Sequence, residues 1–243
     1  MMQNTKKLFF IFTILLFTGI ASAQTYEKVN GMWNAAFIDQ KLNDKLDLRM
    51  EVHLRTIDVF NVWDQQLFRP QIIYKSSKNI QWYAGYTHLR NFNRDVNADP
   101  RVRVEHNLWE QVLYKTPLKK GTFATWVRLE HRFQEELPLQ KEGRNRSFDF
   151  SSRIRFRVIY DRPITQADAK IPTSFVFYNE VFTVMNPEGI PTEFNQNWTF
   201  FGFKLKINSQ MTINTGFQKN TIRKSDDQYL KNRFLNTILF YKL

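Results

Sequence analysis

The most distinctive side chains of this sequence are arginines and glutamates that recur at every second residue. A planar guanidinium pairs with a carboxylate or a phosphate through two parallel hydrogen bonds. Such a set therefore holds an anion, or it pairs with its own carboxylates and forms a rigid network. The set comprises Arg49, Glu51, Arg128, Glu130, Arg132, Arg153, Arg155, Arg157 and Glu180.

Spacing by two places these charges on one face of β-strands. Between Lys45 and Thr56 apolar residues alternate with charged ones, and the same pattern returns in 122–134 and 147–160. Successive side chains of a strand point to opposite faces, whereas an amphipathic helix would show a period of about 3.6 residues. We expect strands at 29–38, 44–56, 66–76, 79–91, 103–116, 122–134, 147–160, 173–184, 196–207, 210–222 and 232–243.

The length of these segments favours strands that cross a membrane. A tilted strand of about 9–11 residues spans a bilayer, and spanning strands must close into a barrel so that every backbone group is paired. We therefore expect an all-β fold, an antiparallel up-and-down transmembrane β-barrel of about 10–12 strands. Because bacterial single-chain barrels have an even number of strands, we favour twelve, with one more strand near 57–66 or within 161–172. With 29–38 outside the barrel, the number would be ten.

Aromatic residues are expected on the outer wall, where lipid meets water. Segment 29–38 is given an outward face of Val29, Trp33, Ala35 and Phe37. Other aromatic residues lie near predicted strand ends and are expected to form girdles. The residues expected in the girdles are Trp33, Tyr74, Trp82, Tyr86, Tyr114, Phe133, Tyr160 and Phe182.

The connections between strands alternate in length. Short turns at 76–79, 117–121 and 208–209 are expected to face the periplasm, and 161–172 is a long exception on that side. The longer extracellular loops are expected at 92–102, 135–146, 185–195 and 223–231. This asymmetry is typical of outer-membrane barrels.

Both ends of the chain predict export and insertion. Lys6 and Lys7, an apolar run at 8–20 and the Ala21-Ser22-Ala23 site form a signal peptide, residues 1–23. Cleavage before Gln24 leaves one barrel domain, 24–243, which we expect in the cell outer membrane. The last strand resembles the signal read by the barrel-assembly machinery. Its apolar face carries Leu235, Leu239, Tyr241 and Leu243.

Composition and motifs argue against several other classes. The net charge of +12 would suit nucleic acid, but an exported protein does not meet it. The chain has no cysteine, and its four histidines form no metal set, so neither a metal nor a cofactor is expected. His131 and Ser152 share the lipid face, which is where a lipid hydrolase would carry its pair, but no orienting partner is identified. An enzyme is therefore not expected.

Several short motifs together resemble a known family. The chain is similar to a family of uncharacterised outer-membrane barrels known as DUF2490, a domain of unknown function, over most of the mature length. The resemblance implies a barrel and supplies no catalytic residue, ligand or partner. The motifs are Arg69-Pro70, Gly85-Tyr86, Glu110-Gln111, Arg128-x-Glu130-His131-Arg132-Phe133, Arg153-x-Arg155-x-Arg157, Asn179-Glu180-x-Phe182 and Phe194-Asn195-x-Asn197 with Gly202.

These patterns predict a non-enzymatic outer-membrane barrel, structural or permitting limited passage of small solutes, anions included. Its partner is membrane lipid, and its oligomeric state is left open. We favour a structural ion-paired network in the lumen, with Glu180 roughly opposite Arg153, over an anion passage. The alternatives are an outer-membrane enzyme acting on lipid or envelope material, and a soluble periplasmic β-barrel binding protein.

Overall fold

Every regular element of the described structure is a β-strand. The computed structural model describes residues 25–93, 102–136, 147–186, 189–225 and 228–243, and side chains from residue 29 onward. The predicted signal peptide and cleavage site lie outside these residues. The strands are β1 (Thr25–Lys41), β2 (Leu46–Ile57), β3 (Val62–Lys75), β4 (Ile80–Asn91), β5 (Arg103–Leu118), β6 (Gly121–Glu135), β7 (Phe148–Pro163), β8 (Thr173–Met185), β9 (Pro191–Lys206), β10 (Met211–Ser225) and β11 (Gln228–Lys242).

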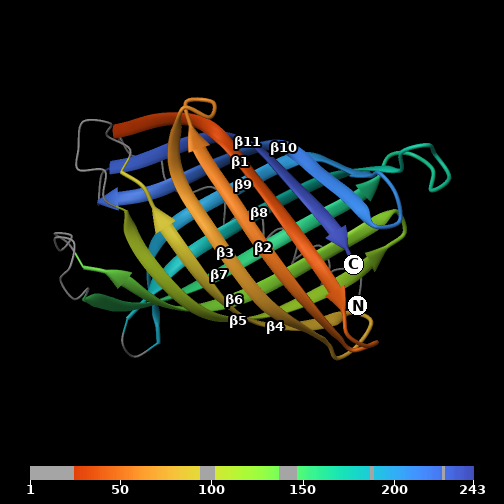
Figure 1. The fold of residues 1–243 in the computed structure, drawn as a ribbon, viewed down its shortest axis with the longest axis horizontal. Helices are drawn as coiled ribbons and strands as arrows, with labels where there is room; N and C mark the ends of the chain where they lie inside the picture. Colours follow the sequence, from red (N-terminus) through yellow and green to blue (C-terminus); the bar gives the residue numbers. More distant parts are fainter. Residues whose placement is uncertain (1–24, 94–101, 137–146, 187–188, 226–227) are drawn as a thin grey trace, which may run out of the picture.

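The eleven strands form one closed barrel. Each pairs antiparallel with the next in sequence, and β1 pairs with β11 in parallel, from Thr25 opposite Gln228 to Asp39 opposite Lys242. Figure 1 shows β1 beside β11 in a wall of tilted strands. The expected all-β barrel of 10–12 strands is confirmed. The preference for twelve is wrong for the described residues. With eleven strands the first and last run in the same direction, and their parallel pairing, which we call the parallel seam, closes the barrel.

The two connections proposed to hide a strand do not contain one. Between β2 and β3 the chain turns within four residues, and Asp58, Val59 and Phe60 all have left-handed backbone angles, with φ of 50°, 49° and 73°. Such angles are uncommon outside glycine and reverse the chain tightly. The connection from β7 to β8, residues 164–172, carries no strand either.

The wall is apolar outside and polar inside along most of its circumference. On β2, the outward Leu48 and Leu54 are 40% and 43% exposed, whereas the inward Glu51 and Arg55 are only 4% and 7% exposed. The alternation predicted for this strand therefore has the expected direction. No helix among the described residues is long and apolar enough to cross a membrane.

The predicted outward face of β1 is wrong as a whole, because Val29 packs against the buried Trp33 and Phe234, and Ala35 shares the inward face of Trp33 and Phe37. Trp33 is buried inside, stacked on Phe234 with ring centroids 4.3 Å apart, and Phe37 contacts His53 and Arg49 inside. Phe182 is also buried inside rather than placed in a girdle. Because aromatic rings suit both the lipid boundary and a filled interior, residue type alone did not assign their side. Tyr74, Trp82 and Tyr114 are exposed on the outer wall.

Candidate functional site

The interior carries an ion-paired cluster on β6, β7 and β8 with contributions from β5. We call it the arginine network. Because inward positions alternate along β7, its three arginines stand in a row that faces acids on both neighbouring strands. The network consists of Glu105, Arg128, Glu130, Arg132, Arg153, Arg155, Arg157 and Glu180.

Glu130 links two arginines of the row. Arg153 lies directly across from it and donates its Nε–H at 2.8 Å, while Arg155 donates from a terminal nitrogen at 2.6 Å. A terminal nitrogen of Arg153 lies 2.6 Å from the same carboxylate, and Glu130 has no solvent exposure. The carboxylate is therefore held by charge-assisted hydrogen bonds, which a buried charge requires.

Glu180 continues the row from the other side. It accepts the Nε–H of Arg155 at 2.6 Å and that of Arg157 at 2.8 Å, with further close contacts from both guanidinium groups. Glu180 lies opposite Arg157 and not opposite Arg153, so the predicted register is wrong by four residues. The cause is the length of β7, which extends to Pro163 and moves the pairing along β8.

Two further members join from β5 and β6. Arg132 makes a bidentate pair with Glu105, both hydrogen bonds 2.8 Å long. Sequence alternation does not say whether Glu105 or Glu110 points inward, because the two fall on opposite faces of β5; the structure buries Glu105 inside and exposes Glu110 outside. Arg128 donates to the amide of Gln111 at 3.0 Å and lies 3.9 Å from Glu130.

Arg49 and Glu51 lie on the opposite part of the wall, in a separate set that we call the Glu51 group: Asp39, Arg49, Glu51, Arg69 and Gln71. Glu51 accepts hydrogen bonds from Arg69 at 3.0 Å and from Gln71 at 2.5 Å. Arg49 pairs instead with Asp39 on β1, at 2.5 and 2.8 Å. The structure thus places all nine predicted residues inside the barrel, in two groups.

Aromatic rings fill the space between the charges. The guanidinium of Arg155 lies 4.2 Å from the ring centre of Phe182, and that of Arg157 lies 4.1 Å from Tyr178. Arg128 covers Trp109 at 3.9 Å. These distances are typical of cation–π contacts, so the rings and the ions are packed as one unit. Sequence patterns alone do not identify these interior rings, because aromatic residues suit the outer wall of a membrane barrel as well as its interior.

Gly85 on β4 makes room for one of these rings. A Cβ atom at this position would collide with the ring of Trp109 and would lie 2.9 Å from the carbonyl oxygen of Pro70. Trp109 donates its indole N–H to Thr87 at 3.1 Å, and Thr87 also accepts from Arg69 at 2.8 Å. One tryptophan therefore connects the arginine network to the Glu51 group.

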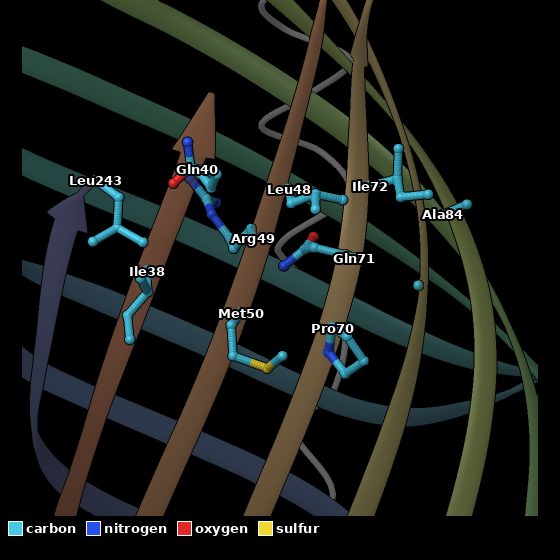
Figure 2. A pocket seen from close by; sticks show the side chains of 11 residues that line it. Ile38, Gln40, Leu48, Arg49, Met50, Pro70, Gln71, Ile72, Ala84 and Leu243 are labelled. Carbon is cyan, nitrogen blue, oxygen red and sulfur yellow. The ribbon is translucent and has the colours of Figure 1, made fainter. Parts of the chain in front are cut away.

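A groove on the outer wall lies over β1–β4. Figure 2 shows it from close by, with small side chains such as Pro70 and Ala84 between longer ones. Its lining offers mainly apolar contact. The apolar side chains that line it are Ile38, Leu48, Met50, Pro70, Ile72, Ala84 and Leu243.

A second outward feature brings together residues considered in the sequence. His131 lies across from Ser152, and its Nε2 is 3.5 Å from the carboxylate of Glu110. All three stand on the outer face of neighbouring strands β5, β6 and β7. Within the described residues, no hydrogen bond joins Ser152 to His131, and no cluster of three potential metal ligands occurs.

The C-terminal face predicted for barrel assembly lies on β11. Its members alternate with the inward Asn236, Ile238 and Phe240, and Leu235 is exposed on the outer wall. Leu243 follows β11, and its backbone N–H donates to the backbone carbonyl of Asp39 on β1 at 2.9 Å.

Comparison with known proteins places this barrel in a family. The model of the family described as "Protein of unknown function (DUF2490)" matches residues 30–231, which include the arginine network and the Glu51 group. No curated protein and no solved structure matches the chain. The chain therefore belongs to the DUF2490 family, as the order of its motifs predicted.

Proposed function

We propose that this protein is a non-enzymatic outer-membrane β-barrel whose interior is sealed by ion pairs and aromatic rings. The observation that carries the proposal is the polarity of the wall. Apolar side chains such as Leu48 and Phe217 face outward, and ionic side chains such as Glu130 are buried inside. A soluble β-barrel has the reverse arrangement, whereas hydrocarbon requires an apolar outer band.

The arginine network supports a sealed lumen over an anion passage. Arg153, Arg155 and Arg157 already donate to carboxylates, so their hydrogen bonds are engaged within the protein. Rings stacked on the guanidinium planes occupy the space that a solute would need. Small barrels are commonly filled by side chains in this way. Its role is then that of a membrane scaffold.

The orientation follows from the connections and the last strand. The end with the short turns 76–79, 119–120 and 207–210 would face the periplasm, and the opposite end would face outward. Lipid would surround the apolar wall. The assembly machinery would recognise β11 through Leu235, Leu239, Tyr241 and Leu243.

Membrane residence is tested by extraction and gel mobility. We expect the protein in the membrane pellet until detergent is added, and we expect its unheated form to migrate differently from the boiled form. Recovery in the soluble fraction without a heat-dependent shift would contradict the proposal.

The sealed interior is tested by conductance in planar bilayers. We expect no steady channel from the natural chain. Arg155→Glu places a third carboxylate beside Glu130 and Glu180, so like charges repel and the filling is disturbed. A stable, anion-selective conductance of the natural chain that Arg155→Glu reverses would instead establish a basic passage.

A second candidate function, hydrolysis of lipid esters, is favoured by the outward Glu110, His131 and Ser152. In that case Ser152 would attack the ester carbonyl while His131, oriented by Glu110, takes its proton and passes it to the alcohol that leaves as the ester C–O bond breaks. Water would then cleave the acyl group from Ser152, which releases the fatty acid and returns the proton to the serine. The test is fatty-acid release from phosphatidylcholine vesicles, with and without calcium. Activity that Ser152→Ala abolishes and the inward control Ser151→Ala retains would establish the enzyme, and no release by the refolded barrel would exclude this substrate.

A further inference from the structure

Two cations stand side by side on the outer wall. Lys219 on β10 lies directly opposite Arg233 on β11, and both side chains are exposed. Their neighbours Gln218 and Phe234 are buried inside, which fixes the outward direction of the pair. Among the described residues neither cation makes a hydrogen bond or an ion pair. We call Lys219 and Arg233 the basic pair.

The basic pair is unfavourable unless an anion lies between its members. Like charges directly opposite each other in a sheet repel. A cation on a lipid-facing wall is strongly destabilising at the middle of the bilayer and costs little at its boundary. A position at the boundary beside a negative group removes both costs.

The position of the basic pair along the strands matches that boundary. We call the barrel end with the short turns 76–79, 119–120 and 207–210 the turn end, and the opposite end the loop end. β10 begins at the turn end with Met211, and Lys219 is the ninth residue of the strand. With a rise of about 3.4 Å per residue and a tilt of about 40°, Lys219 lies roughly 20 Å from that end. An outer-membrane barrel has an apolar band about 25 Å tall, so Lys219 is near the boundary at the loop end.

The surface around the basic pair suits a molecule with a polar head and apolar chains. In the next row toward the turn end, Phe217 lies between Leu235 on β11 and Phe201 on β9. The ring centroids of Phe217 and Phe201 are 5.8 Å apart. In the row of the basic pair, Thr199 flanks Lys219 and Asn30 flanks Arg233. The polar row therefore lies next to an aromatic, exposed surface.

We propose that Lys219 and Arg233 bind the phosphate headgroup of an anionic membrane lipid in the leaflet at the loop end. Arginine binds phosphate through two parallel hydrogen bonds, and lysine adds a point charge. The acyl chains lie along Phe217, Phe201 and Leu235. The inference rests on the proposed membrane-spanning function and adds the class of lipid that the barrel selects.

The test compares lipid retention by the full-length barrel in detergent. The protein is incubated with equal amounts of phosphatidylglycerol and phosphatidylcholine of identical acyl chains, and bound lipid is measured by native mass spectrometry. We expect the natural chain to prefer phosphatidylglycerol by about tenfold, because charged hydrogen bonds join it to the phosphate. The double variant Lys219→Gln/Arg233→Gln should lose this preference.

The matched control removes two positive charges elsewhere. Arg90→Gln/Lys120→Gln changes an exposed outward arginine on β4, which donates to Gln66 at 3.0 Å, and an exposed turn lysine. It should keep the preference, and both double variants should keep the heat-dependent gel shift. The proposal is wrong if the basic-pair variant retains phosphatidylglycerol like the natural chain, or if the control loses it equally.

Two other outcomes are distinguishable. Displacement of phosphatidylglycerol by glycerol 3-phosphate at equal concentration would assign the site to a soluble anion and overturn the lipid proposal. Recovery of the protein without detergent would overturn the membrane function itself. A detergent-dependent barrel without lipid preference would overturn the inference alone.

Discussion

The two sides of the barrel interior solve the same packing problem with different chemistry. The β5–β8 side uses full charges, and each buried glutamate of the arginine network accepts from at least one guanidinium. The β10–β11 side uses amides, which we call the amide cluster: Gln218, Asn220, Asn232 and Asn236. There Gln218 accepts from Tyr178 at 2.7 Å, but neither side-chain polar atom of Asn232 has a hydrogen-bond partner among the described residues.

The difference lies in what an incomplete pairing costs. An unpaired buried charge is far less favourable than an unpaired amide, so each buried glutamate needs a guanidinium partner, whereas the amide side tolerates incomplete pairing. Pairing on the charged side is not complete atom by atom, since Nη1 of Arg128 has no hydrogen-bond partner among the described residues. We therefore expect substitutions to affect the arginine network strongly and the amide cluster weakly.

The largest effect is expected for Glu180→Gln. The substitution keeps the shape but leaves Arg157 without a carboxylate partner and Arg155 with Glu130 alone, which should lower the free energy of unfolding by about 3–5 kcal/mol. Denaturant titration in detergent micelles measures it. The same change at Glu193, which is 60% exposed in its pair with Arg223, should cost at most about 1 kcal/mol. Equal losses at the two sites would remove the special status of the buried network.

An intermediate effect is expected for Gly85→Ala, which tests the packing of Trp109 against Arg128 of the arginine network. The added methyl group would collide with Trp109, and such overpacking costs about 1–3 kcal/mol. The melting temperature of the heat-dependent gel shift reports it. Ala84→Val enlarges the exposed neighbour on the outer wall and should leave that temperature nearly unchanged.

The smallest effect is expected for Asn232→Leu in the amide cluster. The substitution removes a side chain whose polar atoms have no partner in the described part of the chain and keeps a similar size, so stability should change by less than about 1 kcal/mol. The same denaturant titration applies. A loss as large as that of Glu180→Gln would mean that the two sides are equally dependent on pairing.

Local patterns were sufficient to predict the faces of most strands and nine members of the charged interior, but not Asp39, Arg69 or Glu105. Arg153, Arg155 and Arg157 could be assigned inward because alternation is a property of neighbouring residues. The pairing of Glu180 with Arg157 could not, because register depends on where β7 ends. Trp33 was assigned to the wrong side because its ring suits lipid and interior equally. Glu105 needed the assignment of β5 as a whole.

The parallel seam was beyond local patterns for a different reason, and it shapes how the chain folds. The seam joins residues about two hundred positions apart, so it closes a loop that contains the entire barrel. Loop closure of this length costs entropy that only the completed wall repays, which favours zipping of the antiparallel hairpins before closure. Until then β1 and β11 are open edges that invite pairing with other chains. The barrel should therefore assemble in an all-or-none manner, with its first and last strands meeting at the end.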